Sequence, residues 1–201
     1  DLDLQIEGLQ NLGIAYYNIG DYEKTIQNFI KALRIEEERN NIQGMSQAYN
    51  NLGVVFDEIG RKTKALEYYK KALTIKEEFR DSLFMVNTLS NIGLIYLELD
   101  NTQEALEYFN RSLKIDSSLQ NEEGIVKSLN NIGKTYTEMG KLDSSLYYLN
   151  LSLERADALG AYDKASLLNN IGEVHLKSGN NRQAITTFEE ALATGQSVKA
   201  V

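Results

Sequence analysis

A five-fold internal repeat constrains this chain more than any other feature of its sequence. The tripeptide Asn-(Leu/Ile)-Gly occurs at residues 11–13, 51–53, 91–93, 131–133 and 170–172, with successive spacings of 40, 40, 40 and 39 residues. A fixed period indicates one supersecondary unit copied along the chain, because each copy buries its apolar face only against its neighbours. The 201 residues therefore predict one elongated array of five repeats.

Composition favours long helices and argues against metal or thiol chemistry. Proline, which removes a backbone donor and clashes inside a helix, is absent. The chain has no cysteine and a single histidine, His175, so disulfides, thiolate sites and cysteine nucleophiles are excluded and no metal centre or cofactor is expected. These counts leave the compartment open between the cytoplasm and a bacterial periplasm.

Charge and hydropathy limit the kinds of partner that we expect for this chain. The formal net charge of −8 opposes non-specific binding to nucleic acid or to anionic membranes. No apolar run approaches the roughly 18 residues that a membrane-spanning helix needs. We therefore expect a protein or peptide partner, with no nucleic acid and no membrane insertion.

Each repeat is predicted to be two antiparallel amphipathic helices, A and B. In the second repeat, apolar residues from Tyr49 to Ile59 recur at i, i+3, i+7 and i+10, which is one face of a helix. The pattern stops at Gly60 and restarts at Ala65, so helix A is expected over about 43–59 and helix B over about 62–79. The predicted repeats are approximately 3–41, 42–81, 82–121, 122–161 and 162–195, with a tail at 196–201.

Small and turn-forming residues recur in register. Residues that tolerate a left-handed C-cap end the A helices, at Gly20, Gly60, Asp100, Gly140 and Gly179. Polar capping residues are expected at the B-to-A junctions 39–41, 80–82, 120–122 and 160–163. The glycine of the tripeptide lies mid-helix, where it costs about 1 kcal/mol relative to alanine. We attribute it to close approach of helix B, through the small residues twelve positions on: Thr25, Ala65, Ala105, Ser145 and Ala184.

This pattern closely resembles the tetratricopeptide repeat (TPR). The second repeat carries the family's marks in order, at Tyr49, Leu52-Gly53, Phe56, Gly60, Ala65, Tyr69 and Ala72-Leu73. The period of 40 exceeds the family's usual 34, and the usual proline after helix B is missing. The longer form is similar to the repeats of kinesin light chains, of Pins/LGN-like adaptors and of bacterial TPR signalling proteins.

The resemblance implies an all-α, right-handed α-α superhelix of five helix-turn-helix repeats. It further implies a non-catalytic scaffold, not an enzyme, that binds an extended peptide or partner segment in its concave groove. A second interpretation is a sensory or regulatory domain of a bacterial signalling protein that controls an attached output domain. No capping element follows the fifth repeat, so we expect a piece of a longer protein, and self-association through the end repeats stays an open alternative.

The asparagine of the tripeptide is the sharpest candidate site. It recurs at Asn11, Asn51, Asn91, Asn131 and Asn170, and Asn50 and Asn130 precede two of these. Each side chain offers both a donor and an acceptor, so a ladder of them could hold the backbone of an extended peptide, as concave asparagines do in several peptide-binding members of the resembled family. The alternative is that they bond across to the neighbouring A helix and join the repeats together.

Three residues after each ladder asparagine, the residue type changes along the chain. Ile14, Val54 and Leu94 are apolar, whereas Lys134 and Glu173 are charged, and Lys127 adds a second cation to the fourth repeat. The hypothesis is a groove that takes apolar side chains beside repeats one to three and an acidic group near Lys127 and Lys134. The alternative is that the apolar residues only pack against adjacent A helices.

Overall fold

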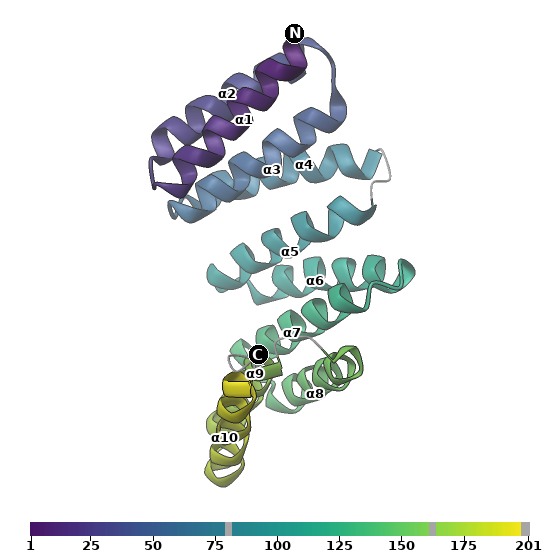
Figure 1. Ribbon diagram of the computed structural model, residues 1–201. Helices are drawn as coiled ribbons and strands as arrows, with labels where there is room; N and C mark the ends of the chain where they lie inside the picture. The colour runs from purple at the N-terminus through teal and green to yellow at the C-terminus, as the bar shows by residue number, and fades with distance from the viewer. Residues whose placement is uncertain (79–81, 161–163, 198–201) are drawn as a thin grey trace. The chain divides into compact units, whose positions relative to one another are not determined.

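The computed structural model describes residues 1–78, 82–160 and 164–197, and over these residues the chain is an all-helical array without strands (Figure 1). The helices are α1 (Leu2–Asn18), α2 (Tyr22–Glu38), α3 (Ile42–Glu58), α4 (Lys62–Glu78), α5 (Ser82–Glu98), α6 (Thr102–Ser118), α7 (Glu122–Glu138), α8 (Leu142–Leu159), α9 (Lys164–Lys177) and α10 (Asn181–Ser197). Helices A and B predicted for the second repeat are confirmed within one residue by α3 and α4.

Consecutive helices pack as helix-turn-helix pairs, with α1 on α2, α3 on α4, α7 on α8 and α9 on α10. The chain divides into two compact units, Asp1–Ile95 and Tyr96–Val201, and the boundary falls inside α5. Every described helix is too short or too polar to span a bilayer. Parts of the predicted junctions at 80–82 and 160–163, and the end of the predicted tail, lie outside the described residues.

The predicted turns have the expected backbone. Gly20, Gly60, Gly140 and Gly179 all have positive φ angles between 69° and 78°, and Asp100 takes the same role with a φ of 58°. These residues follow the A helices, where a left-handed residue lets the last carbonyls find donors. At the B-to-A junctions, Asn41 and Asn121 cap α3 and α7 by accepting from the backbone N–H three residues on.

The mid-helix glycines do admit helix B, but a larger neighbour than expected covers them. A Cβ on Gly53 would meet the ring of Tyr69, sixteen residues on, and the same relation holds for Gly13 with Phe29 and Gly172 with Phe188. The small residues twelve positions on are buried, and Ser145 Oγ donates to the carbonyl of Gly133 at 2.8 Å. The sequence argument found the close approach and missed the side chain that makes it.

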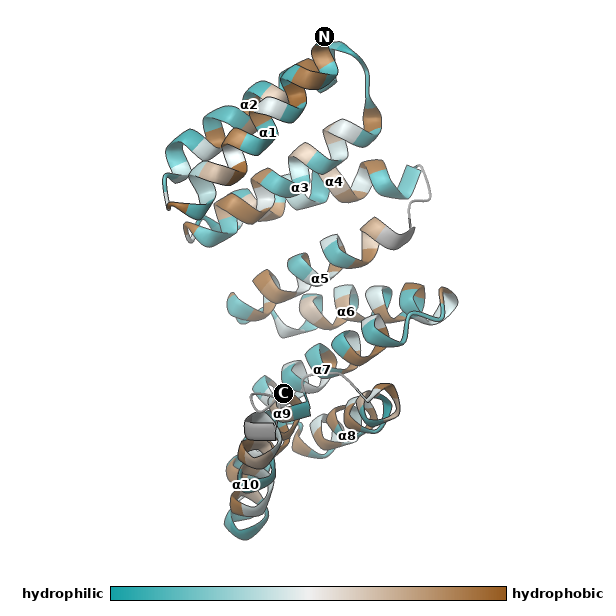
Figure 2. Cartoon of the chain, viewed as in Figure 1, coloured by the Kyte–Doolittle hydropathy of each residue, from teal (hydrophilic) through white to brown (hydrophobic). Residues whose placement is uncertain are grey.

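Hydrophobic and hydrophilic residues alternate along the helices (Figure 2). In each compact unit the core includes residues of both helix A and helix B, such as Leu52 and Tyr69 in the first unit and Ile132 and Leu149 in the second, all less than 2% exposed. Aromatic stacks join the two helices of a repeat, with Phe56 on Tyr68 and Tyr136 on Tyr148 at centroid distances of 5.3 and 5.4 Å. The faces of the A helices that point away from helix B are available for other contacts.

Candidate functional site

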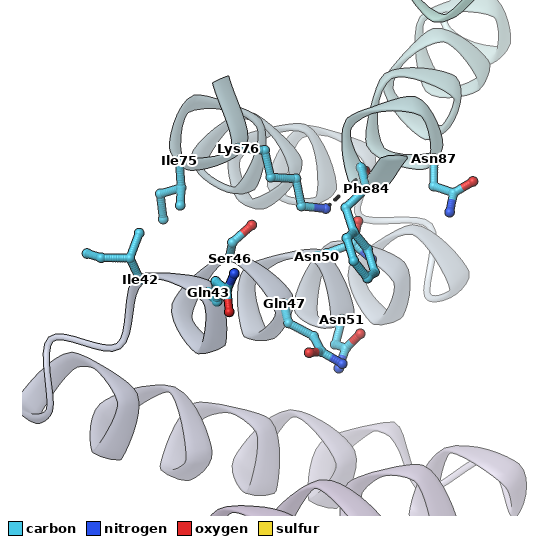
Figure 3. Close-up of a pocket in the computed structure, with 10 residues that line it drawn as sticks. All are labelled: Ile42, Gln43, Ser46, Gln47, Asn50, Asn51, Ile75, Lys76, Phe84 and Asn87. Atoms are coloured by element: carbon cyan, nitrogen blue, oxygen red, sulfur yellow. Dashed lines mark hydrogen bonds between the residues drawn. The ribbon is translucent and has the colours of Figure 1, made fainter. Parts of the chain in front are cut away.

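A pocket of about 700 Å³ lies in the first compact unit, between α3, the end of α4 and the start of α5. Its lining residues are Ile42, Gln43, Ser46, Gln47, Asn50, Asn51, Ile75, Lys76, Phe84 and Asn87 (Figure 3). The α3 residues share one helix face, because they are spaced by three, four, seven and eight residues. We call this the Lys76 pocket; its wall combines carboxamides with the half-buried Ile42 and Ile75 and the exposed Phe84.

Lys76 lines this pocket although it is only 6% exposed. Its Nζ donates to the Phe84 carbonyl at 3.1 Å and to the Thr88 hydroxyl at 2.9 Å, and it lies 5.5 Å from the centroid of the Phe84 ring. The Thr88 hydroxyl also lies 3.2 Å from Asn50 Oδ1. This hydrogen bond joins Asn50 to Thr88 of the next repeat. Asn50 therefore joins two repeats and also lines the pocket.

A second pocket, of about 290 Å³, lies at the equivalent position one repeat earlier in the chain. Its lining residues are Asp3, Ile6, Glu7, Gln10, Glu36, Asn41, Gln43, Gly44 and Gln47. Adding forty to seven of these numbers gives residues of the Lys76 pocket, and Gln43 and Gln47 line both pockets. We call it the Glu36 pocket, since Glu36 stands where Lys76 stands in the next repeat. The two are successive positions along the face of the A helices.

The predicted asparagine ladder is divided between the two interpretations. Asn51 is half-buried and lines the Lys76 pocket, and Asn11 is exposed. Asn91 donates to the hydroxyl of Tyr69 in the preceding repeat, where burial raises the pKa of the phenol. Asn170 Nδ2 donates to Asn130 Oδ1 at 2.7 Å and so joins α9 to α7. Asn131 is half-buried.

The other predicted site residues do not line either pocket. Val54 is half-buried on α3, and Leu94 and Ile14 are exposed on α5 and α1, but none of the three lines either pocket. Lys127 and Lys134 are both exposed on α7, in the second compact unit, and seven residues apart they share a helix face.

Glu36 and Lys76, the buried charged residues of the two pockets, were not predicted from the sequence. Glu36 and Lys76, with Asp116 and Ala156, occupy one position of the repeat, four residues after the buried Ala or Ser of helix B. All four are buried, although three of them carry charge. The available signal was a charged residue at an apolar phase of an otherwise apolar helix face.

Asp116 shows how the fold satisfies a carboxylate at this position. Asn121 Nδ2 donates to Asp116 Oδ1 at 2.7 Å, and the Ser128 hydroxyl donates to Oδ2 at 3.4 Å. Burial raises the pKa of the Asp116 carboxyl, and hydrogen bonds from Asn121, Ser128 and Ser112 oppose that rise. Within the described ranges no group of three or more acidic, histidine or cysteine side chains could hold a metal ion.

Comparison with known proteins identifies the family to which this fold belongs. The tetratricopeptide repeat family matches residues 5–78, 84–158 and 124–197, which together span most of the chain. The chain belongs to the TPR family. It is a long-period member of that family, since its marker tripeptides recur every 40 or 39 residues. A search of the curated proteins finds no match.

Solved structures with similar folds have low sequence identity. BtubC (BKLC) from P. vanneervenii is 20% identical with a TM-score of 0.87, over 98% of this TPR chain and 82% of that one. The apo form of RapI is 18% identical with a TM-score of 0.88, over 97% of this chain and 72% of that one. A Rap protein complexed with Competence and Sporulation Factor is 13% identical with a TM-score of 0.79, over 96% and 54%. These likenesses establish the TPR solenoid fold.

Proposed function

We propose that this TPR chain is a non-catalytic interaction module that binds an extended peptide segment of a partner protein along the A-helix face. The observation that carries the proposal is the Lys76 pocket, whose lining combines carboxamides from two A helices with the half-buried Ile42 and Ile75 and the exposed Phe84. Carboxamides pair with the backbone of an extended chain, and apolar groups such as Phe84, which is 56% exposed, receive its side chains.

Family membership supports a peptide or protein ligand over a small-molecule substrate. One protein with a similar fold, a Rap protein, is complexed with Competence and Sporulation Factor. Extended peptides suit repeat arrays because each repeat presents the same side-chain positions at a regular interval. The Glu36 and Lys76 pockets, one repeat apart, are two such positions.

A random peptide library, screened against the purified chain, tests this function. The test variant is the double substitution Gln47→Ala/Phe84→Ala, at two exposed residues that line the Lys76 pocket. Its matched control is Gln27→Ala/Ile19→Ala, two exposed residues that line neither pocket. Loss of binding in the test variant alone, with helicity unchanged in both, supports the groove. Equal binding by all three proteins would contradict it.

In this proposal, the ladder asparagines bind the backbone of the ligand; they are Asn11, Asn51, Asn91, Asn131 and Asn170. The contacts of Asn91 and Asn170 with neighbouring repeats favour a joining role at these two positions. Asn51, which lines a pocket, is the member best placed to meet a ligand. An Asn51→Ala variant that binds selected peptides as tightly as the parent would remove it from the site.

Lys127 and Lys134 define a second feature of the proposed ligand. Two exposed ammonium groups on one face of α7 form a small positive surface in a chain of net charge −8. We infer that an acidic group of the ligand lies beside them.

A sensory module is the second candidate function. Its support is the likeness to RapI and to the Rap protein complexed with Competence and Sporulation Factor, both longer than this chain. The full-length reading frame distinguishes the two candidates. A kinase, DNA-binding or other output domain encoded in the same frame favours the sensor, and a frame of TPR repeats alone favours the scaffold.

A further inference from the structure

Glu36 is a buried carboxylate that its own fold leaves incompletely paired. The residue lies near the end of α2 and is 5% exposed, and its Oε2 atom has no hydrogen-bond partner among the described residues. It packs against the first turn of α3, where Gly44 provides room, because a Cβ on residue 44 would collide with the carboxylate. A buried carboxylate without partners is costly, so it needs either internal donors or an external cation.

The other repeats show which internal donors are missing. In the third repeat, Asp116 at the same position receives hydrogen bonds from Ser112 and Ser128. The residues in register with those two serines in the first repeat are Ala32 and Ala48, which have no donor. In the second repeat, Lys76 donates to Thr88, which is again in register with Ala48. The first repeat thus retains the carboxylate and lacks the hydroxyl groups.

The Glu36 pocket has the electrostatics of a cation site. Asp3 and Glu7 from α1 join Glu36 in its wall, with carboxamides of Gln10, Gln43 and Gln47 around them. No lysine or arginine is among its described lining residues, although Arg39 donates to Asp3 from outside at 2.6 Å. Carboxylates and carboxamide oxygens are acceptors for ammonium and guanidinium donors, and Ile6 supplies apolar contact for a methylene chain.

We propose that the Glu36 pocket binds a lysine or arginine side chain of the peptide ligand, with the Glu36 carboxylate as its counter-ion. This inference rests on the proposed peptide-binding function and specifies it. The next pocket along the A-helix face carries buried Lys76 in place of Glu36 and Phe84 in place of Gly44. That pocket therefore disfavours a cation, so the two pockets together set the register of the ligand, with its basic residue at the first.

A small-probe titration tests the cation site independently of any library peptide. The probes are N-acetyl-lysine methylamide, N-acetyl-arginine methylamide, their neutral counterpart N-acetyl-norleucine methylamide, and putrescine. Binding is followed by the amide resonances of Gly44 and Gln47, which line the pocket. We expect saturable shifts with the two cationic amino-acid probes and none with norleucine. Equal shifts with norleucine would overturn the proposal.

Variants assign the binding to Glu36. Glu36→Gln keeps the shape and removes the charge, and should weaken lysine-probe binding at least tenfold. Glu38→Gln makes the same change on an exposed residue of α2 outside the pocket and should leave binding unchanged. Ala48→Ser supplies the hydroxyl that the third repeat has, and should weaken binding without removing the carboxylate. If Glu36→Gln binds the lysine probe as tightly as the parent, the assignment is wrong.

The source of the cation is decided by two comparisons. Tighter binding of putrescine than of the lysine probe would assign the pocket to a free amine and overturn the peptide source. Library peptides that bind without enrichment in lysine or arginine would also overturn it, while leaving the groove itself in place. Enrichment of a basic residue that disappears when Glu36→Gln is screened is the expected result.

Discussion

The ring of Tyr69 lies against the Cα of Gly53, in the space that any side chain on residue 53 would occupy. A Cβ there would stand 2.7 Å from two ring atoms. Gly133 has the same relation to Leu149, and Gly172 to Phe188. In the first, second, fourth and fifth repeats, the glycine of the tripeptide is therefore the place where the large residue of helix B crosses helix A.

Gly53→Ala should destabilise the chain by about 1–3 kcal/mol, because overpacking of the buried Tyr69 ring outweighs the helix propensity that alanine gains. Gly8→Ala is the matched control, since a Cβ at this helical glycine meets nothing within 4 Å. It should stabilise α1 by about 0.5–1 kcal/mol. Urea unfolding followed by circular dichroism measures both, and a stabilised Gly53→Ala variant would refute the steric argument.

Asn170→Ala should lower the free energy of unfolding by about 0.5–1.5 kcal/mol, the contribution of a typical hydrogen bond, because it removes the 2.7 Å contact with Asn130 Oδ1. The neighbouring Asn169 is exposed and offers a control on the same helix. Asn169→Ala should change stability by less than about 0.5 kcal/mol. Equal effects of the two substitutions in thermal or urea unfolding would exclude a joining role for Asn170.

The stability of the chain should depend on the protonation of Asp116. Burial holds its pKa above the usual value in the folded state, so the folded chain binds the proton more tightly than the unfolded chain does. The contribution of this group to stability therefore rises as the pH falls from neutral through the folded pKa, and it levels off below the unfolded pKa. Asp116→Asn removes the titration. When the pH is lowered from 7 to 5, the free energy of unfolding, measured with urea, should rise more in the parent, or fall less, than in Asp116→Asn. Identical changes in the two proteins would contradict the prediction.

Lys134→Glu should weaken binding of an acidic peptide by up to about fivefold, the range of an exposed ion pair, and the difference should shrink at high salt. Lys114→Glu reverses another exposed charge, on α6, and should have no such effect. Fluorescence anisotropy at two ionic strengths separates the two variants. Unchanged affinity in Lys134→Glu would remove the α7 surface from the proposed site.

Most of the fold was predictable because it is local and repeated. The apolar period from Tyr49 to Ile59 and the left-handed positions at Gly60 and Gly140 are properties of a few adjacent residues, and five copies reinforce each reading. The candidate site was predicted less well. Asn50 and Asn51 do line a pocket, but Glu36, Lys76 and Phe84, which give the two pockets their charge and shape, were not found.

The sequence by itself determined the helices, their turns, their pairing into repeats and the family. It did so because periodicity and capping act over a few residues. Only the tertiary structure decided that Glu36 keeps an unpartnered oxygen while Asp116 does not, and that Tyr69 covers Gly53. Those outcomes depend on side chains from successive helices, twelve residues apart for Asp116 and Ser128 and sixteen for Gly53 and Tyr69, whose directions are set by how one helix packs on the next. Period alone carries no information about which of them meet.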